Sequence, residues 1–559
     1  MADVSPAALR SAAWVNGDDE VALGHRAALR AAGLTQPTCS ARKGRPLIGI
    51  ACTASDLNRC DRGLTSLAAA VRRGVLEAGG LPLEFPVMSL SEDLMKPTAM
   101  LYRNLLAIEV EETLRSQPLD GIVALGNCDK SVPAYLMALA SADLPALIVT
   151  GGFRPVPVLD GVRLGSGTTL WRMFDERRAG RVSDTDWRRL EGCLGAGIGA
   201  CNTMGTAVTM AIMAEVLGMT LPGSAVIQSG DPAQEVLAEQ AGQWIVALAD
   251  AGTRPSSLLT TAAFERAMTV LAAVGGSTNA IIHLCAVAGR RGLTLPLSRF
   301  AEIAAATPVI ADVAPTGTGL APDLAAAGGV PAVLDVLFSG AEPTWPLVSP
   351  SEPVTPAPAF TVVRGNIAPD GGVIKTAAAT PSLLRHSGPA VVFRSYAEMR
   401  HRIDDLDLDV TADSVLVLAG CGPVGAFMPE WGNIPIPRRL LAEGVTDMVR
   451  ITDGRMSGTG YGTVILHVAP ESAVGGPLSR LRDGDIISLD ALAGTLSADV
   501  PDEVLAARDP VLPPFADRRG WPVLHRGHVL QAPAGCDYDF LRVASPDQLP
   551  FVEPVIGRS

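Results

Sequence analysis

Apolar strands that alternate with helices constrain the fold of this chain more than any other feature. RPLIGIACT (45–53), GIVALG (121–126) and LPALIVTGG (144–152) are continuous apolar runs of strand length, and each lies next to a helical pattern such as LTSLAAAVRRGVLEAGG (64–80). Strands that are apolar on both faces are typical of parallel sheets covered by helices on each side. The first part of the chain is therefore predicted to be α/β, with a parallel sheet.

The pattern changes after residue 340. GAEPTWPLVSPSEPVTPAPAF (340–360) is rich in proline and predicts a linker or a long surface connection. Short strands separated by turns follow, among them DSVLVLAG (413–420) and TVILHV (463–468), and they favour a mainly β, barrel-like domain. Since 559 residues are too many for one core, we expect two domains, 1–355 and 356–559.

Composition excludes several classes of protein. The net charge of −13 leaves no basic footprint for a nucleic-acid binder. No basic segment followed by an apolar core opens the chain and no apolar stretch reaches membrane-spanning length, so neither a secretory signal nor a membrane span is expected. We expect a cytoplasmic protein whose nine cysteines are thiols, metal ligands or core residues rather than disulfides.

Three cysteines lie where apolar or glycine-rich segments end: Cys60 in SDLNRCDRG, Cys128 in GNCDK and Cys201 in GIGACNTMGTA. A single cysteine is most often a core residue. Ligands of open α/β folds, however, gather where strands end. The spacings are not those of a compact zinc site. Three thiolates from distant segments suit an iron–sulfur cluster in which one iron lacks a cysteine ligand.

Charged residues adjoin these segments. Asp129 and Lys130 directly follow Cys128, just after a predicted buried strand, where charges need partners. Glu92 also follows an apolar stretch, and carboxylate oxygens are suitable ligands for Mg²⁺. A solvated turn would explain the same pair of charges. Spacing alone leaves a shared metal site and an ordinary turn both open.

A glycine-rich turn, ITDGRMSGTGYGT (451–463), carries Asp453, Arg455 and Ser457. Glycine permits tight backbone, so the turn could cradle an anion, although an ordinary hairpin connection is the commoner structure. No Walker A sequence, no GxGxxG after a strand and no HExxH is present, and the seven histidines form no ligand pair.

Several long motifs occur in an order that resembles the dihydroxyacid and sugar-acid dehydratase family, which includes dihydroxyacid dehydratase and 6-phosphogluconate dehydratase. They are GNCDKSVPAYLMALA, CNTMGTAVTMAIMAEVLGMTLPGSA, AVGGSTNAIIHLCAVAGR, GNIAPDGGVIK and ITDGRMSGTGYGTVILHVAPESAVGGPLSRLRDGDIISLD. CNTMGTA and LGSGTTLWRMFDERRAG are most similar to the pentonate branch, the arabinonate and xylonate dehydratases.

The resemblance implies a hydro-lyase that removes water from a 2,3-dihydroxy sugar acid to give a 2-keto-3-deoxy acid. It implies that Cys60, Cys128 and Cys201 of the first domain hold an iron–sulfur cluster, of the 2Fe–2S rather than the 4Fe–4S type. The partner is then a small hydroxy acid, and the family implies a homodimer or a homotetramer.

The resemblance also implies a magnesium site and a base. The Mg²⁺ ligands would be Glu92, Asp129, carbamylated Lys130 and Glu430 of FMPEWGNIP. Ser457 of the second domain would be the catalytic base, with Lys130 as the other catalytic residue. A serine becomes a base only when it is ionised, and a nearby cation favours that form.

Two segments depart from the family pattern. The family usually has Thr-Pro before the first cluster cysteine and Asn after it, whereas residues 58–63 read NRCDRG. In CGPVGAFMPE (421–430), Val424 stands where the family usually has Lys. We therefore expect a specialised substrate. Two alternatives stay open: a branched-chain dihydroxyacid dehydratase, and a non-catalytic paralogue that keeps the cluster as a binding or redox-sensing module.

Overall fold

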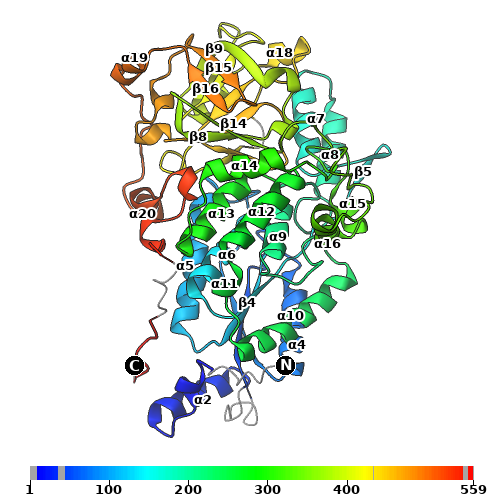
Figure 1. Ribbon diagram of the computed structural model, residues 1–559, viewed down its shortest axis with the longest axis vertical. Coiled ribbons are helices and arrows are strands. Elements are labelled where there is room, and N and C mark those ends of the chain that lie inside the picture. Colours follow the sequence, from blue (N-terminus) through cyan, green and yellow to red (C-terminus); the bar gives the residue numbers. More distant parts are fainter. Residues whose placement is uncertain (1–8, 35–44, 432–433, 546–551, 558–559) are drawn as a thin grey trace.

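The computed structural model describes residues 9–34, 45–431, 434–545 and 552–557. Figure 1 shows a parallel sheet with its helices in the lower part and a β barrel at the top. The fold class predicted from the sequence is confirmed. Cys39 lies outside the described residues.

The parallel sheet has the strand order β2-β1-β3-β4. Its strands are β1 (Leu47–Cys52), β2 (Leu81–Pro86), β3 (Gly121–Leu125) and β4 (Ala146–Val149). Every residue of β1, β3 and β4 is buried, which explains their continuous apolar sequences. Because β1 lies between β2 and β3, the turns that follow these three strands meet at one edge of the sheet.

Helices cover both faces of this sheet. One face packs against α4 (Leu64–Glu77) and α10 (Pro232–Ala251), and the other against α5 (Met100–Ser116) and α6 (Ser131–Ala142). The two helices α4 and α10 approach very closely: a Cβ at Gly242 would lie 2.2 Å from the Val71 carbonyl oxygen. A glycine is therefore required at this crossing.

A further layer of helices lies between the sheet and the barrel (Figure 1). It consists of α9 (Thr206–Val216), α12 (Thr261–Ala273), α13 (Asn279–Arg290) and α14 (Leu297–Ala306). All residues of α9 except Glu215 are buried, as its content of small and apolar residues predicts. The other helices of this part are α1 (Ala12–Val15), α2 (Glu20–Ala31), α7 (Thr168–Arg178), α8 (Asp184–Leu194), α11 (Pro255–Leu258), α15 (Ala321–Ala326) and α16 (Gly329–Leu334).

Eight strands close into a barrel in the order β10-β12-β14-β8-β7-β16-β15-β9. Parallel and antiparallel pairs alternate irregularly around it, and aliphatic side chains such as Val417, Ile451 and Ile465 form its core. The strands are β7 (Thr361–Gly365), β8 (Ala368–Ile374), β9 (Arg385–Phe393), β10 (Val415–Leu418), β12 (Arg450–Thr452), β14 (Val464–Ala469), β15 (Ile486–Asp490) and β16 (Thr495–Ala498). Its helices are α17 (Tyr396–Arg402), α18 (Arg438–Ala442) and α19 (Asp502–Ala507).

The proline-rich connection before β7 is attached to the first part of the protein. Its residue Leu347 is buried, the Val348 N–H donates to the Ile310 carbonyl at 2.8 Å, and the Asp312 N–H donates to the Pro346 carbonyl at 2.8 Å. The predicted domain division at residue 355 falls in this connection. It is a fixed crossover rather than a free linker.

The chain returns to the helical part after the barrel. Helix α20 (Trp521–His528) lies beside α5 (Figure 1), and the Trp521 indole donates to the Leu101 carbonyl at 2.8 Å. Arg290 of α13 and Asp537 form a fully buried ion pair of 2.7 Å. Residues 521–545 thus pack on the α/β part, although their position in the sequence follows the barrel. Among the described residues, no helix combines the length and the apolar character needed to cross a membrane.

Candidate active site

The three cysteines singled out in the sequence line one cavity. Cys60 lies between β1 and α4, Cys128 between β3 and α6, and Cys201 in the segment that leads into α9. Cys60 lies close enough to Cys128 to raise the pKa of the Cys128 thiol. Strand ends that meet at one edge of the sheet therefore bring together thiols from segments 141 residues apart in sequence.

A buried carboxylate joins the first two cysteine segments. Asp61 Oδ1 accepts the backbone N–H groups of Asn127 and Cys128, both at 3.0 Å. In return, the Asn127 side-chain amide donates to the Cys60 carbonyl at 2.9 Å. Burial raises the pKa of Asp61 to about 6, and its four donors partly oppose that shift. Asp61 thus holds Cys60 and Cys128 in a constant relative position.

The surroundings of the thiols suit a bound cationic group. The Cys60 thiol and burial raise the pKa of Cys128 well above its ordinary value, and burial raises that of Cys201 to about 11. The buried Arg154 guanidinium donates to Cys201 Sγ at 3.4 Å. Thiols that resist ionisation alone become good ligands when a metal neutralises them. Three cysteines on one cavity therefore fit an iron–sulfur cluster.

Three carboxylates meet on the same cavity: Glu92 after β2, Asp129 after β3, and Glu430 of β11 (Glu430–Trp431). One oxygen from each lies within 4.8 Å of the others. Like charges this close repel strongly unless cations compensate them. Three convergent carboxylate oxygens are the donor set that a divalent cation such as Mg²⁺ prefers.

Two buried cations compensate these carboxylates. Lys130 Nζ contacts Asp129 and lies 3.3 Å from Glu92 and 3.2 Å from Glu430. Arg455 Nη1 lies 2.6 Å from Glu430, and its Nη2 lies 3.1 Å from Glu92.

These charges shift the pKa of Lys130 in opposite directions. Burial and the Arg455 charge lower this pKa, but the three carboxylates raise it more, so the net pKa is raised. Lys130 Nζ lies among the three acids as a bound cation would. Its carbamylation stays a prediction.

Neutral donors orient two of the acids. Thr98 Oγ1 donates to Glu92 at 3.3 Å. The Asn279 side-chain amide, at the start of α13, donates to Glu430 Oε2 at 3.3 Å. Thr98 and Asn279 both belong to the α/β part of the protein. This part therefore orients Glu430 too, although Glu430 itself belongs to the barrel part.

Ser457 faces the same cavity. The short strand β13 (Arg455–Met456) pairs in parallel with β11 and places Arg455 opposite Glu430. Ser457 follows directly, and its Oγ lies 2.8 Å from Thr459 Oγ1 and accepts the Thr459 N–H at 3.3 Å. These two donors can stabilise negative charge on Ser457 Oγ.

Asp453, which the sequence groups with Ser457, has a different role. It is fully buried and accepts the backbone N–H groups of Cys421 at 2.7 Å and Ser472 at 2.9 Å, so it fixes loops of the barrel. Arg455 binds the protein's own carboxylates.

The cavity has a volume of about 370 Å³ and also presents cations and apolar side chains. Its further lining includes Arg59, Lys96, Leu170, Trp171 and Leu194. This volume lies near the lower end of the range for small-molecule sites, so only a small ligand fits beside the metal groups. Every predicted site residue lines it except Lys130, which lies beneath the carboxylates with a fully buried side chain.

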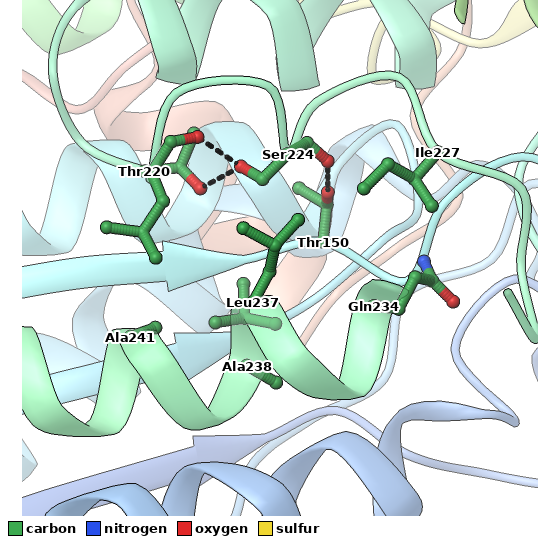
Figure 2. Close-up of a pocket in the computed structure, with 10 residues that line it drawn as sticks. Thr150, Thr220, Ser224, Ile227, Gln234, Leu237, Ala238 and Ala241 are labelled. Carbon is green, nitrogen blue, oxygen red and sulfur yellow. Dashed lines mark hydrogen bonds between the residues drawn. The ribbon is translucent and has the colours of Figure 1, made fainter. Parts of the chain in front are cut away.

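A second cavity is too small to compete for this role. Figure 2 shows it beside α10, where Thr220, Ser224 and Thr150 are joined by hydrogen bonds above Leu237. Its volume of about 20 Å³ has room for about one water molecule.

Sequence reasoning did not identify several residues of the site. Arg455 was noticed only through its glycine-rich turn, whereas Asp61, Thr98, Arg154 and Asn279 drew no functional prediction. The adjacency of Asp61 to Cys60 was the one available signal, since an acid next to a predicted metal ligand needs donors. The others act across segments far apart in sequence, and no local pattern marks them.

Comparison with known families gives two matches that together span most of the chain. The model for the dihydroxy-acid/6-phosphogluconate dehydratase N-terminal domain matches residues 45–342, and the model for the C-terminal domain of the same family matches residues 347–536.

Three relatives illustrate the range of similarity. The chain is 45% identical to 6-deoxy-6-sulfo-D-gluconate dehydratase of Pseudomonas putida, over 96% of each chain. It is 42% identical to L-arabinonate dehydratase of Rhizobium leguminosarum bv. trifolii, over 96% of this chain and 97% of the relative. It is 36% identical to dihydroxy-acid dehydratase of Moorella thermoacetica, over 87% and 92% respectively.

Proposed function

The chain belongs to the dihydroxy-acid/6-phosphogluconate dehydratase family, a family of hydro-lyases, and from this premise we propose that it dehydrates a sugar acid to a 2-keto-3-deoxy acid. Identity is 42–45% to three sugar-acid dehydratases and 35% to D-xylonate dehydratase, against 34–36% to the dihydroxy-acid dehydratases, and the three higher values support the sugar-acid class. One observation carries the proposal: the three predicted cluster cysteines, the three predicted metal-binding acids and the Ser457 hydroxyl all line the same small cavity.

The residues present fit both metal groups of the proposal. Cys60, Cys128 and Cys201 would hold an iron–sulfur cluster, and Glu92, Asp129 and Glu430 would hold Mg²⁺ together with a carbamylated Lys130. When bound, these groups supply Lewis-acid stabilisation of charge on the substrate carboxylate and hydroxyl oxygens.

Ser457 removes the proton in this proposal. Its Oγ takes the C2 hydrogen as a proton while the C3–O bond breaks and hydroxide leaves, so water is lost overall. The resulting enol then tautomerises to the 2-keto acid. The Thr459 N–H donates to Ser457 Oγ, the Thr459 hydroxyl lies 2.8 Å away and can donate to an alkoxide, and the Arg455 guanidinium is two residues away in sequence, so the alkoxide form is favoured.

The cavity disfavours the two alternatives. Arg59, Lys96 and Arg154 place three cations on this cavity beside the apolar Leu170, Trp171 and Leu194, and this charged part of the wall suits a polar acid better than a branched-chain dihydroxy acid. A non-catalytic cluster-binding module has no use for Ser457 aligned with three carboxylates on one cavity. Catalysis on a polar acid is therefore the better account.

The test is 2-keto acid formation by anaerobically reconstituted protein with Mg²⁺. The panel contains gluconate, arabinonate, xylonate, galactonate, fuconate and dihydroxyisovalerate. Turnover of a sugar acid that Ser457→Ala lowers at least about 1,000-fold would support the proposal, and Ser387→Ala, an exposed serine of β9, is the matched control. Dihydroxyisovalerate as the preferred substrate, or full activity of Ser457→Ala, would contradict it.

The same preparation tests the remaining parts of the proposal. A 2Fe–2S cluster gives two irons and two sulfides per chain with its own absorption and spin-resonance signature, whereas 4Fe–4S gives four of each. Light scattering distinguishes the proposed homodimer or homotetramer from a monomer. Fractionation of cells that express the protein tests the proposed cytoplasmic location.

A further inference from the structure

We propose that the substrate is a sugar acid with a second, terminal oxyanion, a sulfonate or a phosphate, and that Lys96 binds this group. The inference rests on the proposed function and extends it to the far end of the substrate. It comes from the charges around the cavity.

Most charged groups of the cavity are already compensated. The three metal-binding carboxylates have Lys130 and Arg455 beneath them. Arg154 donates a hydrogen bond to Cys201 Sγ, so its charge lies beside the cysteines. Arg59 lies 2.9 Å from Asp93. These pairs account for every charged residue of the lining except one.

Lys96 is the exception. Its Nζ donates to the backbone carbonyls of Glu92 at 3.1 Å and Asp93 at 3.4 Å. Among the ion pairs of the described residues, none includes Lys96, so its positive charge has no carboxylate partner. Two carbonyls hold the amine in place without neutralising it, and an ammonium ion has three donors. Lys96 is exposed, so its third donor faces solvent, and a ligand oxyanion that enters the cavity can replace water there.

The position of Lys96 suits the far end of a substrate. A sugar acid whose carboxylate lies at Glu92, Asp129 and Glu430 must extend along the rest of the cavity. Lys96, Arg59 and Trp171 line that cavity too, and its volume of about 370 Å³ brings the end of a six-carbon chain against its wall. A neutral terminal hydroxyl there would not balance the Lys96 charge.

The number of free charges favours a sulfonate over a phosphate. A sulfonate carries one negative charge at neutral pH, which one uncompensated lysine balances. A phosphate monoester carries between one and two, and its excess charge would meet Asp93 at the rim. Sulfonate and phosphate share the oxyanion chemistry, so the experiment includes both.

The first measurement is binding without turnover. Ser457→Ala protein, loaded with Mg²⁺, is titrated calorimetrically with gluconate, 6-deoxy-6-sulfogluconate and 6-phosphogluconate. We expect the sulfo acid to bind about 10- to 100-fold more tightly than gluconate, as a hydrogen-bonded ion pair predicts. Tighter binding of the phospho acid would support an oxyanion site at Lys96 and would show that its ligand is a phosphate rather than a sulfonate.

The second measurement changes the lysine. In the Ser457→Ala background, Lys96→Met should lower the preference for the sulfo acid at least about 10-fold, and Lys96→Arg should restore most of it. Arg62→Gln is the matched control, since Arg62 is an exposed cation of the Cys60 loop outside the cavity, paired with Asp56. It should leave the preference unchanged.

Equal binding of gluconate and the sulfo acid would overturn the inference, as would Lys96→Met weakening both by the same factor. Wild-type enzyme that turns over gluconate but not the oxyanion acids would overturn it and leave the proposed function intact. If the protein binds the sulfo acid tightly but dehydrates none of the acids, the oxyanion site is supported and the proposed function is contradicted.

Discussion

Lys375 tests how much a buried positive charge lowers the stability of this protein. It follows β8 directly, and among the described residues its Nζ has no hydrogen-bond partner. Burial alone lowers the pKa of Lys375 to about 7, against about 10.4 for a lysine in water. We predict that Lys375→Met stabilises the protein at neutral pH.

The magnitude follows from this change in pKa. One pKa unit corresponds to about 1.4 kcal/mol, so keeping the ammonium form buried costs about 5 kcal/mol below pH 7. Because the folded-state pKa is the lower one, the unfolded chain binds more protons between pH 7 and 10.4, and stability rises with pH in that window. The cost falls to about 3 kcal/mol at pH 8 and below about 1 kcal/mol at pH 10.

The assay is the melting temperature of wild type and variant at pH 6.5, 8 and 10. With an unfolding entropy of about 2.1 cal/mol/K per residue, 5 kcal/mol corresponds to about 4 °C for a chain of this length. Arg400→Met, an exposed cation of α17, should change it by less than about 1 °C. A variant no more stable than wild type at pH 6.5, or a gain that does not shrink by pH 10, would refute the reasoning.

Three further predictions concern the cavity. Arg455→Met should destabilise the metal-free protein by about 2–4 kcal/mol, because two partly buried carboxylates lose a buried partner; Mg²⁺ should restore most of the melting temperature, and no recovery would contradict a cation site. Cys201→Ser should at least halve the iron and sulfide retained after reconstitution, whereas Cys193→Ser in α8 should not; equal loss would remove Cys201 as a ligand. Asp61→Ala should cost about 2–4 kcal/mol in urea unfolding, since buried N–H donors lose their acceptor, and Asp61→Asn should cost less; identical midpoints would show that the carboxylate does not join the two loops.

The strands and helices were the most predictable part of the structure. The runs at 45–53, 121–126 and 144–152 became β1, β3 and β4, because a strand buried on both faces must be apolar throughout. The barrel followed from short strands between turns. Strand β11, of two residues, had no signal in the sequence, since it forms by pairing with β13, and that pairing depends on tertiary contacts.

Residues 521–545 show that sequence order alone does not predict which domain a segment packs on. Sequence order places them after the barrel, yet they pack against α5 and α13 through Trp521 and the buried Arg290–Asp537 pair. A segment joins whichever surface buries its apolar and charged groups best, and that surface need not be its neighbour in sequence.

The sequence by itself determined the layers of the fold and the chemical types proposed for the site: thiols, carboxylates, an amine and a serine. Hydrophobic periodicity and turn residues are local properties, so they can be read from one segment at a time. Only the tertiary structure decided how the charges compensate one another. Lys130 and Arg455 neutralise acids from three distant segments, and Lys96 is left with backbone carbonyls alone, because Coulomb interactions depend on distances that no single segment contains.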